Sequence, residues 1–311
     1  MGTTVIDRRA YPAGLRQWDW RARDGWLHRR VDWPQPDGIA PRGSLLFAGG
    51  RGDFVEKYLE ALGDWHARGW SVSSFDWRGQ GRSKGSNSAG HFDSFDILVE
   101  DLGDIIDDWA SSTPGPHVVV AHSMGAHMLL RLLVERRTDI AAAVLVAPMI
   151  AVNSGVFPEW ATAGLAATAT MSGFGRWPIW GVQLARAPVG SARQRILTGD
   201  ADRYEDELYW WDREPDATPV APSFGWLNAA YHSARAFTAE ALAKVEVPVL
   251  LLGADKDQLV SPSAIKRVAG LLPKGELVMY DDCAHEILRE RDHVRGDALA
   301  RIDAFLDKQA R

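Results

Sequence analysis

The stretch VVVAHSMGAHMLLRLL, from Val118 to Leu133, places a single serine between an apolar run and a set of apolar residues at helical spacing. This pattern predicts a buried strand that turns sharply into a helix at Ser123. A serine in that position is typical of the nucleophile elbow, G-x-S-x-G. A helix N-cap is the alternative, because a serine side chain also accepts an N–H of the first helical turn. Residues elsewhere in the chain have to decide between the nucleophile elbow and the N-cap.

Small residues flank that serine on both sides. Ala121 stands where the motif usually has its first glycine, and the second glycine is kept as Gly125. An elbow presses a strand and a helix together around one strained residue, so its flanking positions must be small, and alanine adds only one methyl group. The motif therefore indicates an elbow if a base, an acid and an oxyanion hole follow elsewhere in the chain.

The bulk composition excludes several classes of protein. The 311 residues are 46% hydrophobic and 24% charged, which is ordinary for a globular chain. A net charge of −6 gives no basic surface for nucleic acid, and the single cysteine excludes an internal disulfide. The first residues contain no apolar signal sequence, and no apolar run approaches the roughly 20 residues that span a bilayer. We expect a cytoplasmic protein with no nucleic-acid partner and no transmembrane segment.

Apolar runs alternate with helical patterns along most of the chain. The first two runs bracket a turn and predict an antiparallel hairpin, and the others are apolar enough to be buried on both faces, as parallel strands are. The expected strands are 15–22, 26–33, 44–48, 70–76, 117–122, 141–147, 247–253 and 275–281. The expected helices are 54–67, 92–111, 123–137, 262–272 and 293–308. This alternation predicts an α/β fold with an eight-stranded, mostly parallel, doubly wound sheet.

The alternation stops between about Met149 and Lys244, where no strand is apparent. Six of the fourteen tryptophans fall in this part of the chain: Trp160, Trp177, Trp180, Trp210, Trp211 and Trp226. A helical insertion after the sixth strand predicts a cap, or lid, over the ends of the sheet strands. The expected organisation is a core of residues 1–148 and 245–311 with a cap of residues 149–244.

An acid and a histidine follow the serine in an informative order. In sheets of this type the chain order is serine, then acid, then histidine, with the last two in loops after strands. His285 follows the last predicted strand, and Asp255 and Asp257 follow the strand before it. Asp257 is the better candidate for orienting the histidine, because Leu259 and Val260 can anchor its loop in the core. Asp255 is then expected to be a solvated turn residue or a secondary partner.

An oxyanion hole needs two backbone N–H groups near the serine. One is expected from Met124, the residue after the serine, and the other from the loop AGGRGDF after the first parallel strand. In that loop the glycines let the backbone approach a ligand closely. We expect Arg51 to supply the second N–H and Gly50 to lie against the substrate.

Signals for metals and cofactors are absent from the sequence pattern. The segment HEILR begins like a zinc-binding helix but has Arg289 where the second histidine must stand. The segment GQGRSKG, residues 79–85, fits neither nucleotide-binding spacing. We therefore expect no metal and no cofactor.

The sequence resembles α/β-hydrolases of the lysophospholipase and monoacylglycerol lipase group, often labelled serine aminopeptidase S33-type hydrolases. The segments that carry the resemblance are GRGDFVEKY (50–58), FDWRGQGRS (75–83), GHFDSFDILVEDL (90–102), AHSMGAH (121–127), KDQLV (256–260) and AHEILRE (284–290). The resemblance implies the α/β-hydrolase fold, with an acid directly before a polar–apolar–apolar run, as Asp257 is. The chain departs from the family at Ala121 and Ala126, where members usually carry glycine.

Together these patterns predict a serine hydrolase that cleaves carboxylic esters through an acyl-enzyme on Ser123, with His285 as general base and Asp257 orienting it. The apolar, tryptophan-rich cap suits an acyl chain, and we expect Trp180 and Trp226 to contact it. The expected substrate is a lysophospholipid or a monoacylglycerol, presented from a membrane surface.

Three alternatives remain open from the sequence. A short-ester esterase would need no acyl-chain receptor. An N-terminal peptidase would need a carboxylate at the mouth of the cap to hold a free amine, and Glu205, Asp206 or Glu207 could supply it. A catalytically idle hydrolase fold that binds a ligand commonly lacks one member of the triad, and none is missing here.

Overall fold

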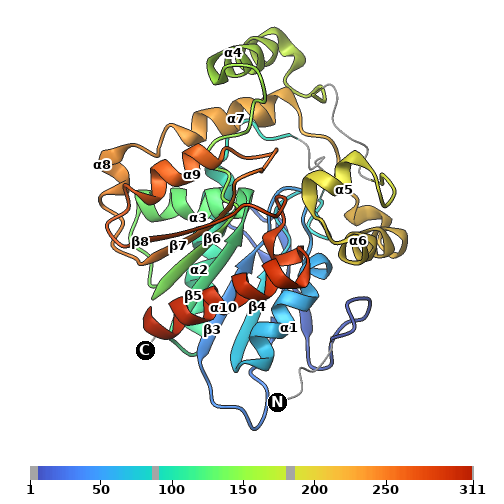
Figure 1. The fold of residues 1–311 in the computed structure, drawn as a ribbon, viewed down its shortest axis with the longest axis vertical. Coiled ribbons are helices and arrows are strands. Elements are labelled where there is room, and N and C mark those ends of the chain that lie inside the picture. The colour runs from blue at the N-terminus through green and yellow to red at the C-terminus, as the bar shows by residue number, and fades with distance from the viewer. Residues whose placement is uncertain (1–5, 86–90, 180–185, 310–311) are drawn as a thin grey trace.

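A computed structural model describes residues 6–85, 91–179 and 186–309 of the chain (Figure 1). Within these residues, eight strands form one sheet in the order β1-β2-β4-β3-β5-β6-β7-β8. The strands are β1 (Arg16–Arg21), β2 (Leu27–Trp33), β3 (Gly43–Ala48), β4 (Trp70–Phe75), β5 (His117–His122), β6 (Ala142–Val146), β7 (Val249–Ala254) and β8 (Gly275–Tyr280). The strand β2 pairs antiparallel with β1 and β4, and every other pairing is parallel. The predicted α/β-hydrolase fold class is confirmed, and each predicted strand is present with ends that differ by two residues or fewer.

Helices cover both faces of this sheet because its central strands are apolar on both sides (Figure 1). In β5, Val118 and Val120 pack into the cluster that includes α1 (Leu59–Ala67) and α10 (Asp292–Gln309). Val119 and Ala121, which point the opposite way, pack into the cluster with α2 (Asp96–Ser112), α3 (Met124–Glu135) and α9 (Pro262–Ala269). The carboxyl ends of the parallel strands are thereby held at one edge of a rigid core.

One predicted helix is two elements in the structure. Residues 54–67 are a 3₁₀ turn, η1 (Val55–Tyr58), followed by α1. The turn is held by the core, because the Val55 N–H donates to Asp76 Oδ1 at 2.9 Å. This turn carries Lys57 and Tyr58, which both contact Asp53 in the loop after β3.

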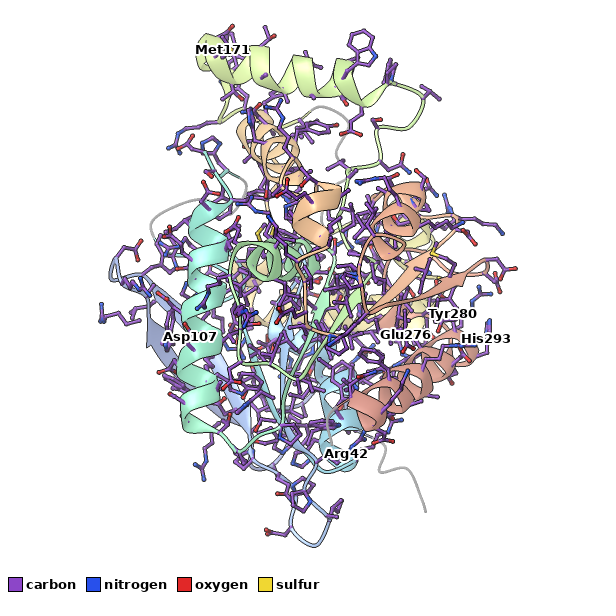
Figure 2. All side chains as sticks on the ribbon, turned by 90° about the vertical axis from the view of Figure 1, so that its left-hand side faces the viewer. Arg42, Asp107, Met171, Glu276, Tyr280 and His293 are labelled. Atoms are coloured by element: carbon purple, nitrogen blue, oxygen red, sulfur yellow. The ribbon has the colours of Figure 1, made fainter. Side chains whose placement is uncertain are left out.

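The insertion between β6 and β7 is helical, as predicted. Its helices are α4 (Glu159–Ala169), which runs into a wider π-helical turn, η2 (Thr170–Phe174), then α5 (Ala192–Leu197), α6 (Ala201–Arg213), α7 (Phe224–Ala234) and α8 (Ala239–Leu242). The helices α4 and α7 pack against each other, whereas α6 packs against η1 of the core. Figure 2 shows α4 standing at the top of the molecule with Met171 at its end, away from the sheet. Among the described residues, no helix combines the length and the apolarity needed to cross a bilayer.

Candidate active site

Ser123 occupies the turn between β5 and α3 in a backbone conformation that few side chains adopt, with φ 51° and ψ −113°. Its side chain makes no capping hydrogen bond to α3, which contradicts the N-cap alternative. A side chain at Gly125 would collide with the backbone carbonyl oxygens of Ala48 and Gly49, so this position has to be glycine. The fully buried Ala121 lies in the middle of the sheet, paired with Ala48 of β3 and Leu145 of β6. This is the strained strand–helix turn of a nucleophile elbow.

The structure brings Ser123, His285 and Asp257 together from the loops after three parallel strands. His285 Nε2 lies 2.9 Å from Ser123 Oγ, and His285 Nδ1 lies 2.7 Å from Asp257 Oδ2. Asp257 Oδ1 accepts the backbone N–H groups of Leu259 and Val260 at 2.8 and 3.0 Å. Val260 is buried in the core as predicted, whereas the Leu259 side chain is 40% exposed and does not anchor the loop. All three side chains of this triad are buried.

The alternative acid lies away from this group. Asp255 pairs with Lys266 at 2.6 Å on the surface, where both side chains are more than a third exposed. Of the two aspartates, it is Asp257 that contacts the histidine.

Charge coupling fixes the protonation pattern of the triad. Burial alone would lower the pKa of His285, but the charge and the hydrogen bond of Asp257 outweigh it and raise that pKa above its ordinary value. Burial would raise the pKa of Asp257, and the charge and hydrogen bond of His285 reverse this and lower it. An ionised Asp257 holds a proton on Nδ1 of the histidine and leaves Nε2 free to accept the proton of Ser123.

Two backbone donors expected for an oxyanion hole lie beside the serine. Within the described residues, neither the Arg51 N–H nor the Met124 N–H donates to another protein group. The N–H of Gly50 is already taken by Asp53 Oδ2 at 2.6 Å. A Cβ at Gly50 would lie 2.9 Å from the Cβ of Ser123, so the loop approaches the serine as closely as a glycine permits.

Ser123 opens into a cavity of about 530 Å³ between the core loops and the cap insertion. Of the residues predicted to contact substrate, Trp226 lies on the cavity wall. Gly50 lies against Ser123 without forming part of that wall, and Trp180 lies outside the described residues.

Other tryptophans of the insertion lie away from the cavity wall. Trp210 and Trp211 pack against Phe54 of the core, and Trp160 is 78% exposed. Of the six tryptophans in this segment only Trp180 and Trp226 were predicted to contact the substrate, and aromatic content alone does not reveal which way the other rings face.

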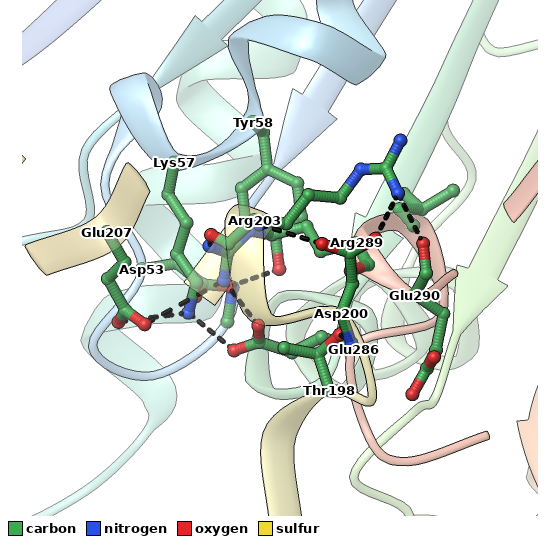
Figure 3. Close-up of polar contacts among 12 residues, drawn as sticks. Asp53, Lys57, Tyr58, Thr198, Asp200, Arg203, Glu207, Glu286, Arg289 and Glu290 are labelled. Atoms are coloured by element: carbon green, nitrogen blue, oxygen red, sulfur yellow. Dashed lines mark hydrogen bonds and ion pairs between the residues drawn. The ribbon is translucent and has the colours of Figure 1, made fainter. Parts of the chain in front are cut away.

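A group of buried charges next to the triad was not found from the sequence (Figure 3). We call Asp53, Lys57, Glu207, Glu286 and Arg289 the buried charge cluster. Lys57 Nζ lies 2.7 Å from Asp53 Oδ1, 2.6 Å from Glu286 Oε1 and 3.4 Å from Glu207 Oε1. Arg289 pairs with Glu286 and lies 3.8 Å from Glu207. Each charge of the cluster is therefore opposed by at least one of the other sign.

Asp53 links this cluster to the oxyanion loop and to a second histidine. Its Oδ2 accepts from the Gly50 N–H at 2.6 Å and from the Tyr58 hydroxyl at 3.1 Å, and it lies 2.9 Å from His122 Nδ1. The His122 ring lies 4.9 Å from the His285 ring, measured between centroids. Burial would raise the pKa of Asp53, but Lys57 and His122 lower it well below its ordinary value. The local signals in the sequence are the i, i+4 spacing of Asp53 and Lys57 and the i, i+3 spacing of Glu286 and Arg289.

This fold and this serine–histidine–aspartate geometry define an α/β-hydrolase. Residues 39–292 match the family described as serine aminopeptidase, S33, and the chain belongs to that family. It is 26% identical to a probable lysophospholipase L2 of Haemophilus influenzae, over 89% of this chain and 87% of that protein. It is 23% identical to the human monoglyceride lipase, over 86% of this chain and 84% of that protein.

The solved structures include the same fold. A soluble variant of monoglyceride lipase from Saccharomyces cerevisiae superimposes with a TM-score of 0.77 at 18% identity, covering 99% of this chain and 100% of that one. The predicted class, a carboxylic ester hydrolase of the lysophospholipase and monoacylglycerol lipase group, is confirmed.

Proposed function

We propose that the protein hydrolyses the carboxylic ester of a single-chain amphiphile, a lysophospholipid or a monoacylglycerol, through an acyl-enzyme on Ser123. The observation that carries the proposal is the contact of Ser123 Oγ with His285 Nε2, 2.9 Å, on the wall of a 530 Å³ cavity. Cavities of about 300–1,000 Å³ are typical of small-molecule sites. The relatives named lysophospholipase L2 and monoglyceride lipase support the same substrate class.

In the proposed mechanism, Ser123 attacks the acyl carbonyl while His285 Nε2 takes its proton. The N–H groups of Arg51 and Met124 stabilise the negative charge that develops on the carbonyl oxygen. His285 then gives the proton to the leaving alcohol. Water, activated by the same histidine, releases the acyl group, and Asp257 keeps the imidazole oriented throughout.

The cavity offers an apolar wall for the acyl chain. Its apolar residues come from the core loops and from the insertion: Met149, Val152, Ile179, Ile196, Leu197, Trp226, Leu227, Leu259 and Val260. We assign residues 149–244 as a cap that covers the serine, because most of these residues belong to it. Burying a chain of methylene groups against such a wall stabilises the complex by about 0.8 kcal/mol for each group.

The outer side of the cap carries the apolar groups that a lipid surface would cover. Val156, Trp160 and Met171 are 93%, 78% and 87% exposed, and Phe157 is 64% exposed. They lie on and around α4, the helix that stands clear of the sheet (Figure 2). Exposed apolar patches with aromatic residues mark sites of contact with partners or membranes. We propose that α4 and the residues around it contact a membrane surface, and that the substrate passes from this surface into the cavity.

The peptidase alternative needs an unpaired carboxylate facing the cavity. Glu205 and Asp206 both pair with Arg9, at 3.0 and 2.7 Å, and Glu207 pairs with Arg193 at 3.0 Å. None of these three acids lies on the cavity wall.

Two other carboxylates, Asp53 and Glu286, do line the cavity, but both are held by Lys57. A free amine would find no uncompensated carboxylate among the described wall residues. The charge distribution therefore favours an ester over an N-terminal peptide.

Replacing Ser123 tests the proposal. Ser123→Ala should lower ester hydrolysis by about 10⁴-fold or more, since only binding and oxyanion stabilisation remain. The rates are measured on p-nitrophenyl esters from acetate to palmitate, a monoacylglycerol, a lysophospholipid and an aminoacyl amide. Ser154→Ala is the matched control, because Ser154 lines the same cavity but its hydroxyl donates to the Phe157 carbonyl.

Each alternative has its own signature in this experiment. A flat chain-length profile would favour a short-ester esterase, and cleavage of the amide alone would favour a peptidase. Retained turnover in pure Ser123→Ala protein would remove Ser123 from the mechanism. An unmodified protein that cleaves nothing and is not labelled by a fluorophosphonate would be an idle binding protein.

A further inference from the structure

The side chain of Arg51 differs in its partners from the other cations on the cavity wall. It donates a hydrogen bond to the Val220 carbonyl, and its guanidinium carbon lies 5.4 Å from the centre of the Trp226 ring. No carboxylate among the described residues lies within ion-pair distance of it. Lys57 and Arg193 line the same cavity, and each of them pairs with Glu207.

The pKa values of Arg193 and Arg51 reflect the same difference in their partners. For Arg193, burial would lower the pKa, but Glu207 outweighs burial and raises it. For Arg51, burial acts alone and lowers the pKa to about 10. The group is still protonated at neutral pH, so this part of the wall carries a positive charge that no carboxylate of the described residues balances.

Two buried donors at this place also have no acceptor. Arg51 Nε and Trp226 Nε1 are both buried, and neither has a hydrogen-bond partner within the described residues. Buried donors are rarely left unsatisfied in folded proteins. An anionic group with several oxygen atoms would balance the free charge, and arginine presents N–H groups in a planar arrangement that suits phosphate.

The position of Arg51 limits which anion this can be. Arg51 follows Gly50, whose Cβ position would lie 2.9 Å from the Cβ of Ser123. Arg51 and Ser123 also line the same cavity, so an anion at the guanidinium lies in the cavity that holds the ester. In a lysophospholipid the phosphate is joined to the ester through one glycerol unit, whereas a monoacylglycerol has only hydroxyl groups there.

We propose that the Arg51 side chain binds the phosphate of the substrate headgroup and makes the enzyme prefer lysophospholipids to neutral monoacylglycerols. This inference rests on the proposed ester hydrolysis at Ser123 and names its substrate more closely. The role belongs to the guanidinium and is separate from that of the Arg51 backbone N–H, which every substitution of the side chain retains.

The test compares two substrates with the same acyl chain, a lysophosphatidylglycerol and a monoacylglycerol. Arg51→Gln should reduce the ratio of their kcat/KM values by roughly 10- to 100-fold, the scale of a lost charge-assisted hydrogen bond, mainly through a higher KM for the phospholipid. Arg51→Lys keeps the charge without the planar N–H arrangement and should reduce the ratio only several-fold. Arg137→Gln, which removes an exposed charge outside the cavity wall, should leave the ratio unchanged.

Several results would overturn the inference. If Arg51→Gln lowers both activities equally, the side chain does not discriminate headgroups, although ester hydrolysis stands. If that variant relieves inhibition by free oleate while the ratio is unchanged, the anion is the product carboxylate. If inorganic phosphate inhibits the unmodified enzyme through Arg51 with no change in the ratio, the site binds a free anion.

Two further controls distinguish failure of this inference from failure of the proposed function and from misfolding of a variant. An unmodified enzyme that cleaves neither substrate removes the proposed function and the inference with it. Thermal melting checks each variant for folding, and should Arg51→Gln be unstable, the ratio measured with Arg51→Lys decides, where no change would count against the inference.

Discussion

Two polar regions border the same cavity, and they are built in opposite ways. The triad is an open chain of two hydrogen bonds that runs from Asp257 through His285 to the hydroxyl of Ser123, which faces the cavity. The buried charge cluster is closed, since Lys57 meets three carboxylates and Arg289 meets two of them. The neighbours His285 and Glu286 belong one to each region.

The triad is built to carry out the reaction, whereas the buried charge cluster is built to support the structure around it. The cluster joins the loop after β3, the cap helix α6 and the segment after β8, so it holds the cap and the oxyanion loop against the core (Figure 3). Removing a member of the triad should therefore abolish turnover with little loss of stability. Removing a member of the cluster should lower the free energy of unfolding first.

The largest expected effect after Ser123→Ala comes from Asp257→Asn. Without the carboxylate the imidazole takes the wrong tautomer, and the same change lowers kcat about 10⁴-fold in a serine protease. We expect a loss of several orders of magnitude in kcat on one chromogenic ester. The melting temperature should change little, because an asparagine oxygen can still accept the N–H groups of Leu259 and Val260.

Asp255→Asn is the matched control for that variant. It removes a carboxylate two residues away, whose partner is the half-exposed Lys266. The loss in kcat should stay below about tenfold, because exposed ion pairs contribute little. The reverse ranking of the two variants would move the triad acid to Asp255.

The next effect concerns stability and is expected from Lys57→Met. The change leaves buried carboxylates without their central cation, and breaking a buried ion pair costs about 3–5 kcal/mol. Urea unfolding measures the loss. Lys57→Met combined with Glu286→Gln should be less destabilised than the single variant, because one uncompensated charge is removed.

Lys244→Met provides the surface comparison. Lys244 pairs with Glu240 in an exposed i, i+4 arrangement, and exposed pairs contribute little to stability because solvent screens them. If Lys57→Met is no less stable than Lys244→Met, the cluster does not support the fold as described.

The same contrast explains what the sequence could predict. The sheet was predictable because its central strands are unbroken apolar runs, and β5 has the predicted bounds, His117–His122. The triad was predictable because its members follow parallel strands of one sheet in a fixed order, so topology alone brings them to one edge. Neither inference needed to know which charged residues meet across the chain.

Predicting the buried charge cluster and the orientation of the cap side chains would have required knowing which residues meet across the chain. Lys57 and Glu286 are 229 residues apart, and nothing in either neighbourhood distinguishes a buried charge from a solvated one. In the insertion, composition predicted helices but not the direction in which each ring faces: Trp226 lies on the cavity wall, Trp210 packs on the core and Trp160 faces outward. Packing directions of this kind arise only when distant segments meet.

The smallest effect is a shift in pH dependence, which tests the coupling inside the triad. Asp257 raises the pKa of His285 above its ordinary value of 6.5, and only the neutral imidazole can accept the proton of Ser123. Activity should therefore fall as the pH is lowered, along a limb of kcat/KM centred above 6.5.

The contribution of His285 to folding stability changes with pH in the opposite direction to the activity. A raised pKa means that the protonated histidine stabilises the fold below the unfolded pKa, and this contribution is lost as the pH rises through the folded pKa. In Asp257→Asn the acid limb of the residual activity should move to lower pH, because the carboxylate that holds the proton is gone. A limb that stays in place would mean that other charges near His285, such as Glu286 of the buried charge cluster, set its pKa.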